Sequence, residues 1–190
     1  MLTSLYPYTL NDLLCLKKSG EPLYPLVRED YDKKVLEWAE AQVMAGDESE
    51  ALLIFASLNQ DKIQDDRALK RYLDADRHEA GLNYPDKRTS ALTCLKIQLW
   101  NLVHCEDARI AETLLYGFAA AFLNSPPEFF ARAFRYLSWL YFHLYDDLGG
   151  EYQTLASETS ADETLFYIKK YITPVYRKLK NDDWLNVILS

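Results

Sequence analysis

The amino-acid sequence predicts an all-α protein that folds as a single domain over residues 1–190. Three observations carry this prediction. Apolar residues recur at spacings of three and four along most of the chain, which is the period of an amphipathic helix. No stretch alternates apolar and polar residues between turn signals, as a half-buried strand does. Only 6 glycines and 7 prolines interrupt the 190 residues, a length typical of one globular domain.

Four helices are expected in the first half of the chain. A short helix over 9–18 stops at Gly20, and a longer one over 27–45 carries Tyr31, Val35 and Trp38 on one stripe. Gly46 is placed to end this second helix, because glycine readily adopts the left-handed conformation of a C-terminal cap. A short apolar helix over 47–58 and a polar helix around 65–76 follow.

Two further helices are expected in the middle of the chain. After a break at 81–85, leucines at spacings of 3, 4 and 3 form a stripe that faces a core: Leu92, Leu95, Leu99 and Leu102. Asp107 is a suitable N-cap for the next helix, which reaches Leu123. Its inward positions are Ile110, Leu114, Phe118 and Ala121.

Residues 125–128 carry the strongest helix-start signal in the sequence. Ser125-Pro126-Pro127-Glu128 combines a capping serine, a proline at the first helical position and a glutamate that can reach back to the cap. We expect this helix to run to Asp147 or Leu148, before Gly149-Gly150, and to pair antiparallel with the 107–123 helix. Residues 136–145, YLSWLYFHLY, are apolar or aromatic on every side, which predicts an enclosed central helix with Trp139 in the core.

The last quarter of the chain begins with a polar loop over 153–160. A stripe from Ala161 onward contains Leu165, Ile168, Ile172, Val175 and Leu179, and Pro174 within it predicts a kink or a split. A final segment over 182–189 is also expected to pack. In total we expect about seven to nine helices, in an irregular bundle or a short array of helical hairpins.

The negative charge is concentrated in two segments. The net charge is −8, and residues 29–66 contain eleven acids and three lysines, whereas 120–165 contain seven acids and two arginines. Nucleic-acid binders cluster Lys and Arg, so this balance argues against a nucleic-acid partner. No apolar stretch has the length of a membrane span. The acidic segments either form a solvated surface or dock a basic protein.

Motifs for catalysis and metal binding are missing from the sequence. The three cysteines, Cys15, Cys94 and Cys105, show no C-x-x-C spacing, which argues against a disulfide framework and favours a reducing, cytoplasmic location. No H-E-x-x-H motif, glycine-rich phosphate loop or nucleophile elbow occurs. We therefore expect a protein without enzymatic activity, cofactor or metal. The densest polar cluster could form part of a magnesium site, although it is also an ordinary helix exit: His143, Asp146, Asp147 and Glu151.

Partner binding is the remaining function that the composition favours. The chain has 14 tyrosines and 4 tryptophans, and aromatic rings interleaved with acids are typical of a protein-binding face. The candidate residues lie in the polar connection before the fourth helix and around the double glycine: Asp61, Asp65, Asp66, Asp146, Asp147, Glu151, Tyr145 and Tyr152.

A small, acidic, all-helical chain of this kind resembles the immunity proteins with which bacteria neutralise their own toxins. The resemblance is one of size, charge and class. It implies one-to-one binding of a basic nuclease toxin by a monomer or weak homodimer. Two alternatives belong to other classes: a helical adaptor with a groove for a peptide, and an enzyme with an unrecognised helical site.

Overall fold

The computed structural model describes residues 6–18, 31–57, 66–124, 128–146 and 154–181. Within these ranges all regular secondary structure is helical, which confirms the predicted fold class. The helices are α1 (Leu10–Lys18), α3 (Tyr31–Met44), α4 (Glu50–Ser57), α5 (Asp66–Glu79), α6 (Lys87–His104), α7 (Ala108–Asn124), α8 (Ala131–Tyr145), α9 (Leu155–Glu158) and α10 (Ala161–Lys180).

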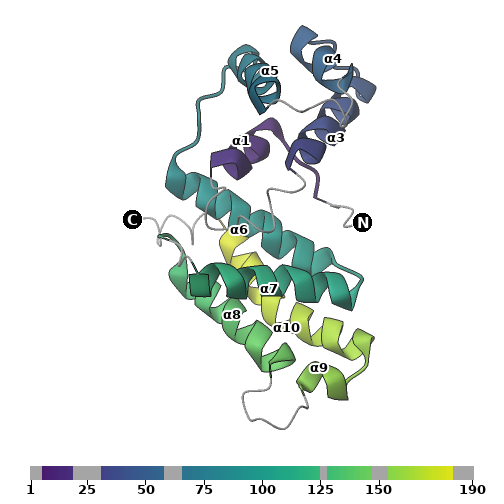
Figure 1. The fold of residues 1–190 in the computed structure, drawn as a ribbon, viewed down its shortest axis with the longest axis vertical. Coiled ribbons are helices and arrows are strands. Elements are labelled where there is room, and N and C mark those ends of the chain that lie inside the picture. Colours follow the sequence, from purple (N-terminus) through teal and green to yellow (C-terminus); the bar gives the residue numbers. More distant parts are fainter. Residues whose placement is uncertain (1–5, 19–30, 58–65, 125–127, 147–153, 182–190) are drawn as a thin grey trace.

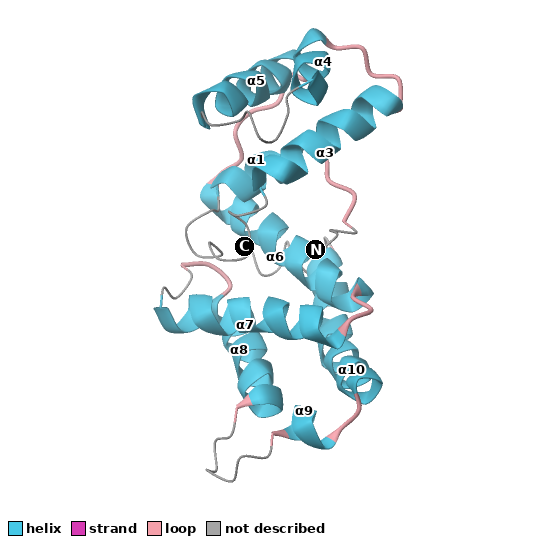
Figure 2. Ribbon diagram, turned by 45° about the vertical axis from the view of Figure 1, so that its right-hand side comes forward, coloured by secondary structure: helices cyan, strands magenta, loops and turns pink. Residues whose placement is uncertain are grey.

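The helices are stacked along one long axis. Figure 1 shows α3, α4 and α5 at one end, α1 and α6 in the middle, and α7 to α10 at the other end. The turned view in Figure 2 shows the same order. One continuous cluster of buried apolar side chains runs through the stack, from Leu10 in α1 to Leu179 in α10. The arrangement is therefore an elongated array with an unbroken core.

The enclosed helix of this array is α6. It packs against α1 on one side and against α10 on the other. All four leucines of its predicted stripe are buried, and so are Cys94, Ile97 and Gln98. Burial on several sides of α6 makes it the structural centre, a position that the sequence assigned to the helix around residues 136–145.

Helix α8 does not occupy the centre, and the prediction that Trp139 lies in the core was wrong. The Trp139 side chain is 47% exposed. The buried residues of α8 form a single stripe, which includes Phe134, Leu137, Leu140 and Leu144. The remaining aromatic residues of α8 lie at the surface or at its margin, because tyrosine, tryptophan and histidine have polar atoms that are satisfied in water.

The antiparallel pairing of α7 and α8 is confirmed. The Phe118 and Phe134 rings lie 5.3 Å apart between centroids, and the Tyr116 and Tyr141 rings lie 5.5 Å apart. Residue numbers therefore rise along α8 as they fall along α7.

Two predicted helix ends are confirmed at atomic detail. Gly46 has a φ of 96°, and the Asp47 amide donates to the Gln42 carbonyl over 3.1 Å, which closes a Schellman-type cap after α3. At the start of α7, the Asp107 carboxylate accepts a hydrogen bond of 2.7 Å from the Arg109 amide. Local sequence chemistry determines both ends.

The start of α8 differs from its sequence signal. The helix begins at Ala131, and its N-cap is Phe130, which has a φ of 60° and makes no capping hydrogen bond through its side chain. Glu128 precedes the helix and is not its third residue, while 125–127 lie outside the described residues. The expected capping box is therefore wrong as the start of α8.

The region after residue 153 contains more helix than expected. The predicted loop includes α9, and α10 continues through Pro174 as one helix of 20 residues, so it is not split there. Ser160 and Glu163 form a reciprocal capping box at the start of α10. The expected segment over 182–189 lies outside the described residues, as do Gly20 and Gly149-Gly150.

Candidate functional site

A row of stacked aromatic side chains covers one side of α8 and α10. We call it the aromatic surface, and it consists of Tyr136, Trp139 and His143 from α8 with Tyr167 and Tyr171 from α10. The Trp139 and His143 rings are stacked 5.2 Å apart at an angle of 8°, and Tyr136 stacks on the other side of Trp139 at 5.9 Å. On α10, the Tyr167 and Tyr171 rings are 4.6 Å apart.

Two polar contacts join the halves of the aromatic surface. His143 Nε2 lies 3.2 Å from the Tyr167 hydroxyl, and the Tyr136 hydroxyl donates to the Tyr171 carbonyl over 3.4 Å. A hydrogen bond to Tyr171, together with burial, raises the pKa of Tyr167 to about 12. The Tyr167 phenol is therefore neutral at physiological pH, and the two polar contacts link the rings of α8 and α10.

The aromatic surface is partly exposed to solvent, whereas the side chains of a core helix would be buried. Trp139 is 47% exposed and His143 is exposed, while the three tyrosines are partly buried. A stack of aromatic rings is both rigid and amphipathic, which are the properties of anchor residues in protein interfaces.

The aromatic surface continues along both helices toward a cavity. On α8 the stripe Arg132, Tyr136, Trp139 and His143 has spacings of 4, 3 and 4, which keep these residues on one helix face. On α10 the stripe Tyr167, Tyr171, Pro174 and Lys178 has the same spacings. Because Arg132, Pro174 and Lys178 line the cavity, the aromatic surface and the cavity form one continuous feature between the two helices.

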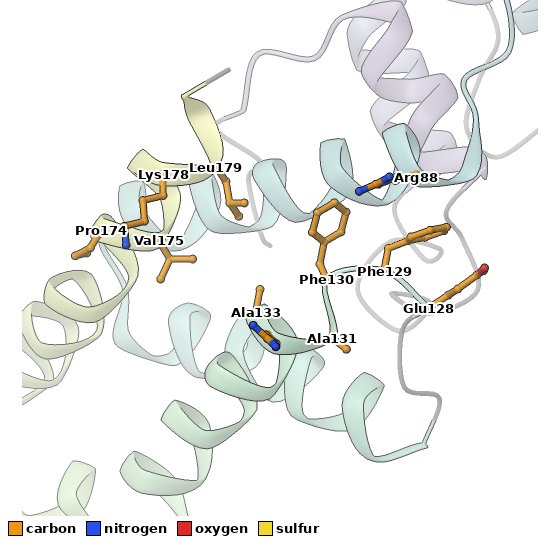
Figure 3. A pocket seen from close by; sticks show the side chains of 11 residues that line it. Arg88, Glu128, Phe129, Phe130, Ala131, Ala133, Pro174, Val175, Lys178 and Leu179 are labelled. Carbon is orange, nitrogen blue, oxygen red and sulfur yellow. The ribbon is translucent and has the colours of Figure 1, made fainter. Parts of the chain in front are cut away.

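The cavity has a volume of about 600 Å³ and lies among α6, α8 and α10. Figure 3 shows the Val175 and Leu179 side chains of α10 pointing into it opposite Phe130 and Ala133. Phe129, Ala131 and Pro174 complete its apolar lining. A largely apolar cavity with a few polar groups at its edge is the usual form of a small-molecule site.

The charged residues that line the cavity have the opposite sign to the whole chain. Arg88, Arg132 and Lys178 contribute three positive charges, and Glu128 contributes one negative charge. The chain as a whole has a net charge of −8. This part of the surface therefore favours anions, unlike the chain as a whole.

Phe130 introduces backbone strain at the edge of the cavity. Its φ of 60° and ψ of 26° lie in the left-handed region, where a bulky side chain is unfavourable. Such residues cost about 1–3 kcal/mol and concentrate at functional sites. The conformation carries the Phe130 ring into the cavity wall that Figure 3 shows.

The candidate residues from the sequence are only partly described. Asp146 is exposed and caps the C-terminal end of α8. Tyr145 is partly buried, and burial is the main cause that raises the pKa of its hydroxyl to about 12. Asp66 is the first residue of α5, but its side chain lies outside what the structure describes. The following residues lie outside the described residues altogether: Asp61, Asp65, Asp147, Glu151 and Tyr152.

Asp66 and Asp146, one described residue from each acidic group, lie far apart along the long axis. Figure 1 shows α5, which Asp66 begins, at one end, and the C-terminal end of α8, where Asp146 is the cap, toward the other.

The candidate magnesium cluster is only partly described, because Asp147 and Glu151 lie outside the described residues. His143 is engaged in the aromatic surface through Trp139 and Tyr167. Within the described ranges, no three His, Cys, Asp or Glu side chains come together as metal ligands would. The three cysteines are buried and form no disulfide.

No protein-family model, curated protein or solved structure matches this chain. Within the described ranges, none of the helices combines the length and the apolar character that a membrane span requires.

The sequence carries one signal for this site, which is the repeated spacing of 4, 3 and 4 in α8 and α10. This spacing marks the two stripes that contain the aromatic surface, whereas the apolar character of residues 136–145 predicted that the α8 aromatic residues lie in the core. The cavity itself combines residues 88, 128–133 and 174–179. Such distant segments are brought together only by the packing of three helices.

Proposed function

We propose that this protein acts by binding another protein and that the aromatic surface is the centre of the interface. The observation that carries the proposal is the half-exposed Trp139, fixed in a ring stack between His143 and Tyr136. Ordered tryptophan and tyrosine side chains contribute binding energy with little loss of conformational entropy.

A narrower proposal concerns the chemistry of the partner. The net charge of −8 supports a basic partner, such as the toxin that an immunity protein inhibits. Three buried cysteines without a disulfide support a reducing, cytoplasmic location for this activity. A helical adaptor that binds a peptide is the second candidate, and it is supported by the groove that the aromatic surface and the cavity form between α8 and α10.

Alanine substitution on the aromatic surface tests the main proposal. Full-length protein captures its partner from the source cells, and the dissociation constant is then measured with the purified pair. Trp139→Ala is expected to weaken binding about thirtyfold, as a hot-spot residue of about 2 kcal/mol does. Because Trp139 is half exposed, the free energy of unfolding should fall by less than about 1 kcal/mol.

Phe166→Ala is the matched control. Phe166 is an aromatic residue of α10 that is 71% exposed, and the helical period places it on a different face of the helix, about 100° from Tyr167 and about 140° from Tyr171. Its replacement should leave binding unchanged. Equal binding by the parent and Trp139→Ala would contradict the proposal, and so would a single-stranded oligonucleotide that binds through Trp139.

The two acidic groups are tested separately, because Asp66 begins α5 and Asp146 follows α8, toward opposite ends of the stack. Asp146→Asn should reduce association with a basic partner more than the triple change of Asp61, Asp65 and Asp66 to Asn, since Asp146 follows the helix that carries Trp139. The effect should diminish at high salt. Equal association rates for all these variants would contradict the basic-partner proposal. The role of the aromatic surface would still be tested by the binding of Trp139→Ala.

A further inference from the structure

We propose that the cavity among α6, α8 and α10 binds a small amphipathic anion, a fatty carboxylate whose apolar chain lies against Phe130, Val175 and Leu179 and whose carboxylate is attracted to the lining arginines, Arg88 and Arg132. The cavity adjoins the aromatic surface, but the residues proposed to contact this ligand are not members of that surface. Binding of this ligand goes beyond the proposed function and does not depend on it.

The shape and lining of the cavity favour a small ligand with an apolar body. Its volume of about 600 Å³ lies within the range of about 300–1,000 Å³ that is usual for small-molecule sites. Seven of its eleven lining residues are apolar: Phe129, Phe130, Ala131, Ala133, Pro174, Val175 and Leu179. An apolar chain that leaves water for this space gains free energy in proportion to the area that it buries.

The charges of the cavity select the sign of the headgroup. Three of the four charged residues that line the cavity are cations, Arg88, Arg132 and Lys178, in a protein whose net charge is −8. The N-terminus of α8 adds to this potential, because its first turn contains no acid and its N-cap side chain accepts no hydrogen bond. A cationic headgroup would be disfavoured inside the cavity.

Two arginines favour a carboxylate over other anions of the same size. A guanidinium group donates two parallel hydrogen bonds to a carboxylate, a geometry that lysine does not offer. Arg88 lies on α6 and Arg132 lies on α8, so each of the two helices offers one guanidinium group to the headgroup.

The strained Phe130 gives the cavity its apolar wall. The left-handed conformation of Phe130 departs from the ordinary N-cap geometry and has no capping hydrogen bond to offset its cost. Its ring is one of the apolar side chains that face the open space in Figure 3. An apolar ligand in this space would make van der Waals contacts with the Phe130 ring that water does not make.

Isothermal titration of the full-length chain with dodecanoate, below its micelle concentration, tests the proposal. Dodecanol and dodecyltrimethylammonium are the matched probes, since they share the chain length but lack the negative charge. We expect one dodecanoate per chain, weaker binding of dodecanol and no binding of the ammonium compound. Equal binding of all three would overturn the proposal, as would no binding of dodecanoate.

Arginine variants distinguish dodecanoate binding in the cavity from a general electrostatic attraction of dodecanoate to the protein. Arg88→Gln with Arg132→Gln should weaken dodecanoate binding at least about tenfold. Arg135→Gln removes one positive charge from another face of α8, beside Phe122, and should change binding by less than about twofold. If all arginine variants bind dodecanoate like the parent, the proposal is wrong.

Ala133→Trp should fill the cavity and abolish binding, and its thermal midpoint shows whether the variant still folds. A chain that ends at Asn181 and gains a binding site that the full chain lacks would identify the last nine residues of the protein as the occupant. Self-association that Ala133→Trp abolishes would identify a second copy. Either result would overturn the proposal.

Discussion

Asp76 is a buried carboxylate without an ordinary stabilising partner. Its side chain is only 6% exposed, and Oδ2 accepts no hydrogen bond within the described part of the chain. Burial, together with the neighbouring Glu79 and Asp47 carboxylates, raises the pKa of Asp76 to about 6. The folded protein therefore binds a proton at this position more tightly than the unfolded chain does.

A raised carboxyl pKa makes stability fall as the pH rises. Below about pH 4 the group is protonated in both states, and between about pH 4 and 6 the unfolded chain ionises first, which lowers the free energy of unfolding. At pH 7 the native state holds an unfavourable charge. Asp76→Asn should therefore stabilise the protein by about 1 kcal/mol at pH 7 and by much less near pH 4, as measured by urea unfolding.

Glu40→Gln is the control for Asp76→Asn, because Glu40 is an exposed acid of α3 and its replacement changes the net charge equally. It should give the same stability as the parent at both pH values. A destabilised Asp76→Asn at pH 7 would mean that the carboxylate has a favourable partner there.

Pro174 removes one backbone hydrogen bond from α10. The helix continues from Ala161 to Lys180, although proline has no amide hydrogen for the Lys170 carbonyl. The Thr173 hydroxyl donates to the Lys169 carbonyl over 2.7 Å in the same turn. Pro174 is exposed, so tertiary packing around its ring does not explain its presence in the helix.

Pro174→Ala is expected to stabilise the protein by about 1–3 kcal/mol, because alanine restores the amide donor and has the best helix propensity. Differential scanning calorimetry should show a midpoint increase of about 2–4 °C per kcal/mol for a chain of this length. An unchanged midpoint would mean that the loss of proline's rigidity in the unfolded chain cancels the gain.

The sequence predicted where helices begin and end better than it predicted which of their faces are buried. The ends at Gly46 and Asp107 were predictable because a cap depends on a few neighbouring residues. The central position of α6 was not predictable in the same way. Counting tyrosine, tryptophan and histidine as apolar predicted that α8 is the enclosed helix. The cavity was not predictable either, since Arg88 and Lys178 lie 90 positions apart in sequence.

The whole molecule is a stack of helices with one core. Trp38 of α3 is buried near one end, and Trp139 of α8 lies toward the other, with α6 between them. Buried apolar side chains connect both ends through α6. Loss of α6 from the stack would expose apolar surface on both sides at once, so the two ends should unfold together.

Two single-tryptophan proteins test this cooperativity. One keeps Trp38 and the other keeps Trp139, with the remaining tryptophans changed to phenylalanine. Urea unfolding followed by fluorescence should give a midpoint in each protein that matches its own midpoint by circular dichroism. Two distinct midpoints within one protein would show that the ends of the stack unfold separately.

The anchoring of α8 and α10 has an evolutionary consequence. Each of these helices buries one stripe against the core, chiefly on α7 or α6, while a second stripe of each, with spacings of 4, 3 and 4, faces the groove. The side chains that form the groove are thus largely distinct from those that hold the helices in place. Mutation can change what the groove recognises and leave the scaffold intact, which makes this fold a suitable starting point for the diversification of binding specificity.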